Sequence, residues 1–517
     1  MNERVSSWRA VWLALKSRRT AAVTLLSFSS GLPLGLVWIA IPTWLAREGV
    51  DIKLIGLFTL AQAPWSFKFL WSPLMDRYRP PLGALGGKLA WTLLMQIALL
   101  ALTLWLAGLA THADAIWMIA SLTFAIAFAS ASQDIAIDAY AVEVLEPHEQ
   151  GVAVGARTAF YRAAMFVAGG VAITLAGLWS WPVMFGAIAF MYAPMMLITL
   201  FSPRPATDKL HAPQTLREAV WEPFLGFLAK QRALELLAFV VLYKLADNLA
   251  GALVRPFLVQ VGFNDFDVGI ATATIGLLTT LAGTFLGGML TTAMGLGHAL
   301  WTFGALQVLS NLGYVWIAVA GVDRGIMYAA MGFESLTTGM GTGAFGVLLL
   351  RMTQKQFSAT QYALFSSLFA LPRIVAGPVT GVMVDAMGWL DFFLFTIVVG
   401  IPGLLMLHRF SPFGVREPQI EAIADVQPRA YTRRELTTRA LVGGAIAFAV
   451  AALAVATLDA FKLQRLTHGD FDLLAPLLGV FAPVRVGDWL ALFGVCLFSV
   501  LIALAAAATA AARSGKK

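Results

Sequence analysis

Two aspartates with the spacing of helix neighbours are the clearest candidates for chemistry in this sequence of 517 residues. Asp134 and Asp138 stand four residues apart inside a long apolar segment, so on a helix their side chains share one face, about 6 Å apart. Two like charges in an apolar medium disfavour joint ionisation, and one carboxyl should therefore hold its proton more tightly than a free aspartate. Such a group can load a proton on one side of a membrane and release it on the other. The alternatives are a solvated Asp138 at the inner mouth of the span and a structural Asp134.

Six further charged side chains lie within apolar segments, and the signs of the whole set balance. Its members are Lys68, Asp134, Asp138, Arg162, Lys244, Asp247, Glu334 and Arg373. Each charge costs at least about 2.5–3.5 kcal/mol at the centre of a membrane helix, and such residues usually mark a route for ions or substrates. We therefore predict a functional set. Buried ion pairs that only fix helix contacts are the alternative, in particular a pair between Lys244 and Asp247 along one helix.

Aromatic and amide side chains accompany these charges. Tyr161 and Tyr243 each precede one of the buried bases, and Gln62 and Gln133 lie inside apolar segments. Aromatic faces stack on sugar rings and polar tips donate hydrogen bonds, so these residues fit a ligand that contains sugar. Ordinary packing against lipid or protein is the alternative for each aromatic residue taken singly.

The composition places these residues in a membrane protein. Hydrophobic residues make up 59% of the chain and charged residues only 13%, about half the charged share of soluble domains. Apolar stretches of 18 or more residues indicate membrane-spanning helices. A soluble enzyme, a disordered chain and a secreted disulfide scaffold are excluded, the last because Cys496 is the single cysteine. The net charge of +7 resides in short loops and indicates no nucleic-acid binding.

Hydropathy and turn residues predict fourteen spans, each long enough to cross about 30 Å of hydrocarbon. They lie near residues 21–45, 54–74, 89–109, 115–138, 152–177, 180–201, 234–257, 268–291, 297–320, 326–350, 361–384, 388–409, 438–458 and 487–512. Loops on the side of the N-terminus carry 25 Lys and Arg against 7 on the other side, with Arg157 counted as a residue of the loop side. This bias indicates that both termini are cytoplasmic. Before the first span, Trp8, Val11, Trp12 and Leu15 at helical spacing predict a short helix on the inner membrane surface, which anchors the orientation.

Two polar stretches divide the spans into groups of six, six and two. We predict a six-helix bundle over 1–201, a cytoplasmic loop over 202–233, a second six-helix bundle over 234–410, and two additional helices with their linker over 411–517. Spans 3, 6, 9 and 12 hold no deep charge, as expected if they face lipid while the others surround a central site. Two six-helix halves around a midplane site are a transporter pattern. The sequence therefore predicts an all-α polytopic membrane protein that transports a solute.

Several long and unusual strings carry a resemblance to a known family. They are F-K-F-L-W-S-P-L-M-D-R-Y at 67–78, S-A-S-Q-D-I at 130–135, L-Y-K-L at 242–245 and F-S-A-T-Q at 357–361. Through them the chain resembles the AmpG-type muropeptide permeases, a branch of the major facilitator superfamily, along spans 1 to 12. All eight buried charges fall at positions that look shared with that family. Asp76 and Arg77 also resemble the cytoplasmic gating motif of the superfamily, although the usual glycines and second arginine of the motif are missing.

The resemblance implies a major facilitator fold with two extra C-terminal helices, and proton-coupled import of peptidoglycan fragments across the bacterial inner membrane. The cargo would be N-acetylglucosaminyl-1,6-anhydro-N-acetylmuramic acid with or without its peptide, used in peptidoglycan recycling and, in some bacteria, in β-lactamase induction. On this hypothesis the proton-coupling residues are Asp134, Asp138, Asp247 and Glu334, and Asp76 and Arg77 form a gate. The substrate-binding residues are Lys68, Arg162, Lys244, Arg373, Gln62, Gln133, Tyr161 and Tyr243. The proton gradient is the driving force, no cofactor is expected, and we expect a monomer.

Three other functions fit the same spans and charges: a proton-coupled exporter, an importer of another sugar or drug, and a membrane-embedded muropeptide sensor. An ATP-driven pump does not fit, because the chain has no G-x-x-x-x-G-K-[ST] phosphate loop. A membrane-embedded transferase or hydrolase would need a catalytic cluster in a sizeable loop, and the loops show none, so we expect no enzyme. The group His468, Asp470 and Asp472 fits a solvated loop better than a metal site.

Overall fold

The computed structural model describes residues 7–51, 54–55, 58–82, 85–112, 115–205, 215–228, 233–418, 431–467, 470–484 and 486–513. These residues form helices and connecting turns, and no strand occurs among them. The chain divides into two compact units. Unit 1 comprises residues 1–220, 237–377 and 387–420, and unit 2 comprises residues 221–236, 378–386 and 421–517.

The first bundle of unit 1 extends from α1 to α12. Its helices are α1 (Ser7–Leu15), α2 (Arg18–Gly35), η1 (Leu36–Ala40), α3 (Ile41–Arg47), η2 (Phe58–Gln62), α5 (Ala63–Phe67), η3 (Lys68–Leu70), α6 (Ser72–Arg77), α7 (Gly87–Leu109), α8 (Ile116–Val144), α9 (Gln150–Phe166), η4 (Val167–Val171), α10 (Ala172–Ala176), α11 (Trp181–Phe190) and α12 (Tyr192–Phe201). α2 packs against α8 and α9, and α7 packs against α8, α11 and α12. Trp44 and Phe185 meet edge to face in the core of this bundle, with ring centroids 5.5 Å apart.

The second bundle follows α13 (Leu216–Leu228). Its helices are α14 (Ala233–Leu242), α15 (Leu245–Gly251), α16 (Val254–Val261), α17 (Asp265–Gly269), η6 (Ile270–Ile275), α18 (Gly276–Met294), α19 (Leu296–Ser310), α20 (Leu312–Ala320), α21 (Arg324–Met352), η7 (Lys355–Phe357) and α22 (Ser358–Phe410). α21 packs against α18, α19 and α20. Aromatic rings fill the core, where Tyr314 stacks on Phe393 with centroids 4.9 Å apart.

Unit 2 contains the last helices of the chain, α23 (Arg433–Thr467), α24 (Leu474–Phe481) and α25 (Val486–Arg513). α23 packs along α25, and α24 packs against both. Glycines of α23 allow this approach, because a Cβ on Gly443 would lie 3.0 Å from the Cβ of Ala506. Small residues at a helix contact are typical of membrane helices.

Glycine and proline interrupt several of the long helices. Pro33 lies inside α2, which passes into the π-helical turn η1. α22 runs for 53 residues but breaks at Gly388, whose φ of +79° separates the eleventh expected span from the twelfth. Gly295 joins α18 to α19 with a φ of +90°. Residues with a Cβ adopt such positive angles at a cost, so glycine permits both breaks. The second of them confirms the boundary expected near 292–296.

Eleven helical segments are long and apolar enough to cross a membrane, counted over the described residues. The expected spans at 54–74, 326–350 and 361–384 fall outside this set, although helices lie there. These three spans hold Lys68, Glu334 and Arg373. In the first of them, η2, α5, η3 and α6 are each no longer than six residues, so none crosses a membrane by itself.

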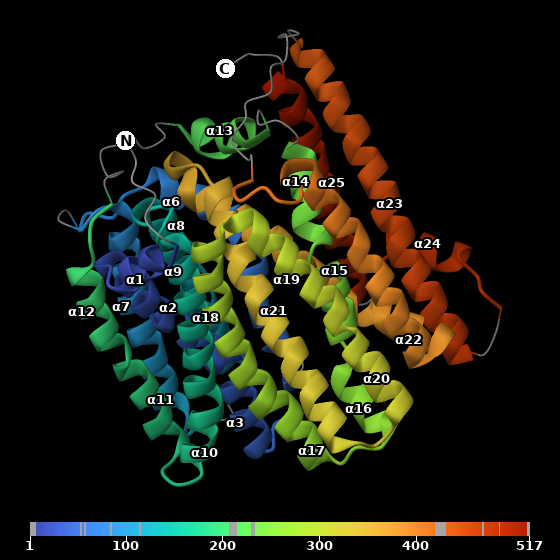
Figure 1. Ribbon diagram of the computed structural model, residues 1–517, viewed down its shortest axis with the longest axis horizontal. Coiled ribbons are helices and arrows are strands. Elements are labelled where there is room, and N and C mark those ends of the chain that lie inside the picture. Colours follow the sequence, from blue (N-terminus) through green and yellow to red (C-terminus); the bar gives the residue numbers. More distant parts are fainter. Residues whose placement is uncertain are drawn as a thin grey trace. The chain divides into compact units, whose positions relative to one another are not determined.

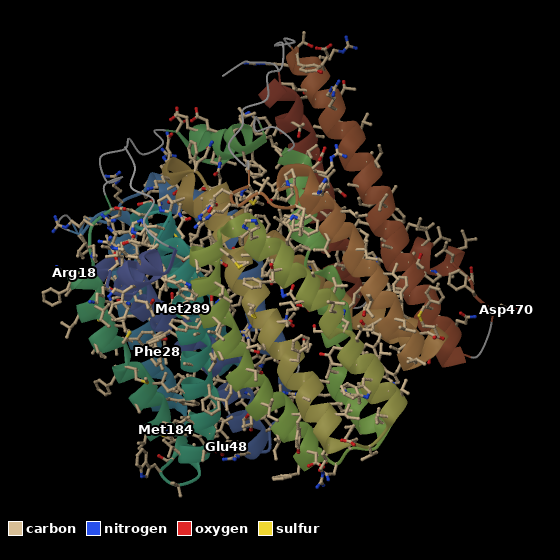
Figure 2. The ribbon with its side chains drawn as sticks, in the orientation of Figure 1. Arg18, Phe28, Glu48, Met184, Met289 and Asp470 are labelled. Carbon is tan, nitrogen blue, oxygen red and sulfur yellow. The ribbon has the colours of Figure 1, made fainter. Side chains whose placement is uncertain are left out.

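The start of α2 and the end of α6 lie at the same end of unit 1, together with the 145–149 loop and the start of α22. We call it the basic end, because it carries Arg18, Arg19 and Arg77. Figure 2 shows Arg18 and Glu48, at the two ends of the first span, toward opposite ends of the bundle.

The two bundles of unit 1 meet along α9 and α18 (Figure 1). A Cβ on Gly288 of α18 would lie 2.3 Å from the backbone oxygen of Gly151 and 2.7 Å from the Cα of Gly155, both on α9. Glycine thus allows backbone-to-backbone contact between the bundles. Because α9 begins and α18 ends at the basic end, this contact closes unit 1 there.

Candidate functional site

A buried cluster of charges in the first bundle centres on Asp138. Its Oδ2 lies 3.1 Å from Nζ of Lys68, and its Oδ1 accepts from the guanidinium of Arg157. Asp138 and Lys68 are both 7% exposed. Three elements supply the cluster: η3, α8 and α9. One carboxylate between two cations leaves one positive charge in excess, and the solvated Asp138 considered from the sequence is not what the structure shows.

The assignment of Arg157 to the loop side is wrong. Arg157 lies eight positions into α9 (Gln150–Phe166), and its side chain is only 15% exposed. Its position five residues before Arg162, in one uninterrupted apolar segment, is the sequence signal that could have revealed it. Its partner Asp138 explains how the bundle accommodates the charge, because a buried cation needs a counter-ion.

Asp134 lies one helical turn before Asp138 on α8 and has a different environment. It is 8% exposed, and its carboxyl hydrogen-bonds to Ser30 of α2. No described residue forms an ion pair with it, and its Oδ1 has no hydrogen-bond partner among the described residues. The two aspartates predicted from spacing therefore differ: Asp138 forms ion pairs with Lys68 and Arg157, and Asp134 forms none with a described residue.

A second cluster lies in the second bundle. Nζ of Lys244 lies 2.8 Å from Oδ2 of Asp247. The hydroxyl of Thr338 on α21 lies 3.0 Å from the same Asp247 oxygen and 3.1 Å from Oε1 of Glu334. Ser335 donates to the other Glu334 oxygen at 3.3 Å. The i,i+3 pair considered from the sequence is thus present, and Thr338 extends it to Glu334.

Arg162 and Arg373 are the two predicted bases that belong to neither cluster. Neither forms an ion pair with a described residue. Arg162 of α9 is half-buried and Arg373 of α22 is exposed, and the repulsion of Arg373 acts on Arg162 directly. Two guanidinium groups from different bundles therefore lie near each other without a bound carboxylate. Guanidinium groups bind carboxylates in a bidentate manner.

The predicted amides and aromatics differ in burial and in hydrogen bonding. Gln133 donates to Ser29 at 2.6 Å and keeps Oε1 without a partner among the described residues. Gln62 and Tyr161 are half-buried. Tyr243 is a packing residue, because its hydroxyl donates to the backbone oxygen of Leu300 at 2.9 Å and it is 8% exposed.

One aromatic pair was not anticipated as a pair. Trp38 in η1 meets Trp65 in α5 edge to face, with ring centroids 6.0 Å apart. Both indole N–H groups lack a hydrogen-bond partner among the described residues. A buried indole N–H usually has a partner, so the pair can still donate to a ligand.

Asp76, which was predicted as a gating residue, joins the two bundles at the basic end. It is 7% exposed and accepts from the start of α22: Oδ1 from the N–H of Ala359 at 3.1 Å, and Oδ2 from the N–H and hydroxyl of Thr360 at 2.8 and 2.7 Å. Helix N-terminal N–H groups lack partners within the helix and favour anions. Arg77 instead lies over the ring of Tyr78, 5.0 Å from its centroid.

Lys88 and Glu143 complete this contact and were missed from the sequence. Nζ of Lys88 on α7 lies 2.5 Å from Oδ1 of Asp76 and also donates to the backbone oxygen of Met75 at 3.1 Å. Glu143, near the end of α8, accepts from the hydroxyl of Ser358 at 2.5 Å. Both residues stand at the ends of spans, where charged residues are common, so the sequence did not distinguish them from ordinary loop charges.

Comparison with known proteins decides the family. The sequence model of the major facilitator superfamily matches residues 23–375. This chain belongs to the major facilitator superfamily. The anhydromuropeptide permease of Escherichia coli strain K12 is 42% identical over 391 residues, which cover 75% of this chain and 79% of that relative. An uncharacterised protein of Haemophilus influenzae is 34% identical over 410 residues, which cover 77% of this chain and 95% of that relative.

Solved structures agree on the fold. The human organic anion transporter MFSD10 matches with a TM-score of 0.58 at 16% identity, covering 75% of this chain and 99% of that one. The proton:xylose symporter XylE matches with a TM-score of 0.58 at 12% identity, covering 78% and 98%. The predicted major facilitator fold is thereby confirmed, and the chain is a multi-pass membrane protein of this superfamily.

Proposed function

We propose that this major facilitator protein imports anhydromuropeptides together with protons. The observation that carries the proposal is the 42% identity to the anhydromuropeptide permease of E. coli over three quarters of the chain. The site geometry supplies a role for each part of the cargo.

Arg162 and Arg373 are the cargo-binding cations in this proposal. The peptide-bearing cargo is an anion, and these guanidinium groups are the two predicted bases without a carboxylate partner among the described residues. Lys68 and Lys244 already have partners, at 3.1 and 2.8 Å, so they serve the acids rather than the cargo. Gln133 and the Trp38–Trp65 pair offer hydrogen bonds and ring faces to the disaccharide.

Proton binding is best supported at Glu334 and Asp134. Thr338 lies within hydrogen-bond distance of carboxyl oxygens of both Asp247 and Glu334, yet a hydroxyl group has only one hydrogen to donate. Both contacts are satisfied when one carboxyl carries a proton. Because Lys244 pairs with Asp247, Glu334 is the acid that carries it. Asp134 has the corresponding role in the first bundle, as the buried acid that forms no ion pair with a described residue.

The basic end is the cytoplasmic end in this proposal, in the inner membrane of a bacterium, with both termini inside. The contacts of Asp76 and of α9 with α18 then hold the cytoplasmic side closed, so this conformation loads cargo from outside. An anion that enters a negatively charged cell is opposed by about 2.3 kcal/mol per charge per 100 mV. Co-transport of protons removes this opposition. We propose a monomer without a cofactor as the transporting form.

The test is uptake of labelled anhydro-disaccharide, with and without peptide, into proteoliposomes that contain only this protein. We expect uptake when the outside is acidic and its loss when an ionophore collapses the gradient. Arg162→Gln should reduce uptake of the peptide-bearing cargo more than that of the disaccharide, because the peptide-bearing form carries more carboxylates than the single one on the muramic acid of the disaccharide. Asp391→Asn, a change of an exposed carboxylate, is the matched control.

Three results distinguish the alternatives. Binding of cargo by folded protein without net uptake would indicate a sensor. Flux that runs into everted vesicles in exchange for protons would indicate an exporter, because the lumen of such vesicles corresponds to the outside of the cell. Full gradient-driven uptake by Asp134→Asn and by Glu334→Gln would remove the proton roles assigned above, while the cargo assignment would stand.

A further inference from the structure

The short helix α1 (Ser7–Leu15) has a buried edge that contacts both bundles of unit 1. Val11 is 4% exposed and Ala14 is fully buried. They form one apolar cluster with Val152 of α9 and with Ala293 of α18, against which Met289 also packs. α1 therefore spans the line along which the two bundles meet at the basic end.

The C-terminal end of α1 is fixed in place. The hydroxyl of Ser17, which follows α1 and caps α2, donates to Glu149 at 2.5 Å. Arg19 pairs with Glu146 and lies 3.7 Å from Glu149. The loop that precedes α9 thus holds the junction of α1 and α2, and the orientation of α1 about its axis is defined.

The remaining two edges of α1 point away from the bundles and differ in character. Trp8, Trp12 and Leu15 form an apolar edge and are 63%, 58% and 42% exposed. Arg9 and Lys16 form a cationic edge beside it, and both are exposed. Nζ of Lys16 lies 4.5 Å from the ring centroid of Trp12. Tryptophan next to lysine and arginine on one helix is typical of a helix that lies in a membrane interface.

We propose that α1 is a clamp across the two bundles, held in place by anionic phospholipid of the adjacent leaflet. The lipid headgroups pair with the cationic edge while the tryptophans enter the interface. Opening of the basic end must separate α9 from α18, and a helix seated on both resists that separation. Anionic lipid therefore favours the conformation that is closed at the basic end. This inference concerns the membrane and not the cargo, so it is independent of the proposed substrate.

Thiol accessibility of position 14 tests the clamp. The variant Cys496→Ser/Ala14→Cys carries one thiol, on the buried edge of α1, and is placed in nanodiscs of neutral phosphatidylcholine or of equal parts phosphatidylcholine and phosphatidylglycerol. Each cation near an anionic surface strengthens binding roughly fivefold at low salt. With two cations we expect labelling by a water-soluble maleimide to be up to about 25-fold slower in the anionic discs.

Two charge variants in this background identify the cause. Arg9→Gln/Lys16→Gln should label in anionic discs as fast as the parent labels in neutral ones. Arg433→Gln/Arg434→Gln, which removes two exposed charges at the start of α23, should keep the slow rate. Equal labelling rates of the parent in the two lipids would show that anionic lipid does not hold α1. Fast labelling in both lipids would show that α1 does not pack stably against the two bundles. If inorganic phosphate slowed the labelling in neutral discs, the ligand of the cationic edge would be a free anion and not the lipid surface. None of these readouts requires transport.

Discussion

Asp76→Asn should open the basic end of unit 1. The carboxylate accepts three hydrogen bonds from the start of α22, two from backbone N–H groups and one from the hydroxyl of Thr360. These bonds cross from the first bundle to the second, so they exist only while the end is closed. The bond from Lys88, at 2.5 Å, stays within the first bundle and is kept in both states. The substitution therefore weakens the closed state selectively.

The size of the effect follows from these bonds. A hydrogen bond to a charged group contributes about 1.5–3 kcal/mol, and an unmade one leaves a buried donor without a partner. Asparagine keeps one oxygen but presents an amide nitrogen to a donor, so at least one bond is lost and the charge no longer strengthens the others. A loss of about 2–4 kcal/mol corresponds to roughly 30- to 900-fold in the equilibrium between closed and open states. Thr360→Val, which removes only the hydroxyl bond, should cost about 1.5 kcal/mol, or roughly tenfold.

Labelling of a thiol at Ala139, in a Cys496→Ser background, measures this opening. Ala139 is fully buried beside Ala359 and Ala363 of α22, so a reagent reaches it only when the bundles part. The expected order of labelling rates is Asp76→Asn, then Thr360→Val, then the parent. Lys88→Met should lower Tm with little effect on labelling, because its bond does not cross the interface. Parent-like labelling of Asp76→Asn, in protein with an unchanged Tm, would refute the carboxylate as the link between the bundles.

Three further predictions test other contacts. Gly288→Leu should part the bundles and speed the same labelling, because overpacking costs about 1–3 kcal/mol, whereas Gly269→Ala, which meets nothing within 4 Å, should not. Tyr243→Phe should lower Tm by a few degrees and leave cargo binding intact, since its hydroxyl bonds only the backbone. The hydrogen bond from Arg19 holds the pKa of Glu146 below its usual value. The pairing of these two residues therefore stabilises the protein fully at pH values above the usual pKa. This stabilisation is lost as the pH falls through the lowered pKa. A Glu146→Gln variant should therefore differ slightly in Tm from the parent at neutral pH and match it in strong acid or high salt, as expected for an exposed pair.

The fold was largely predictable because a bilayer imposes simple rules. Apolar length sets where helices lie, and loop charge sets their direction. The length rule fails where a span is broken, as in the expected span at 54–74, where η2, α5, η3 and α6 are each no longer than six residues. The breaks in η2–α5–η3–α6 leave no signal in hydropathy, but Pro64 and Pro73 stand in the first turns of α5 and α6 and mark two of them.

The site was predictable as a set of residues and not as a set of partners. The free-energy cost of placing a charged side chain in the membrane is enough to single out these residues, because such residues are rare in spans and usually functional. Which acid pairs with which base depends on the contact between helices distant in sequence: Asp138 meets Lys68 across 70 residues. The pair Lys244–Asp247 was foreseen because it is local, three residues along one helix. Thr338 and Arg157 were missed because a hydroxyl and a charge near a span end resemble ordinary helix residues.

In the proposed mechanism, the charge balance of the first bundle links the proton to the cargo. Lys68, Arg157 and Arg162 are three cations against Asp134 and Asp138, and Tyr161 lies where the charges of both aspartates and of Arg162 act on it. With both acids ionised, one positive charge is in excess; protonation of Asp134 raises the excess to two. An anionic cargo therefore binds more tightly to the protonated protein, and by linkage cargo binding favours proton uptake by the same factor, typically 5- to 150-fold. Affinity for the peptide-bearing cargo should rise as pH falls, and Asp134→Asn should bind it tightly at every pH. A pH-dependent affinity in Asp134→Asn as large as in the parent would place the coupling proton on another group.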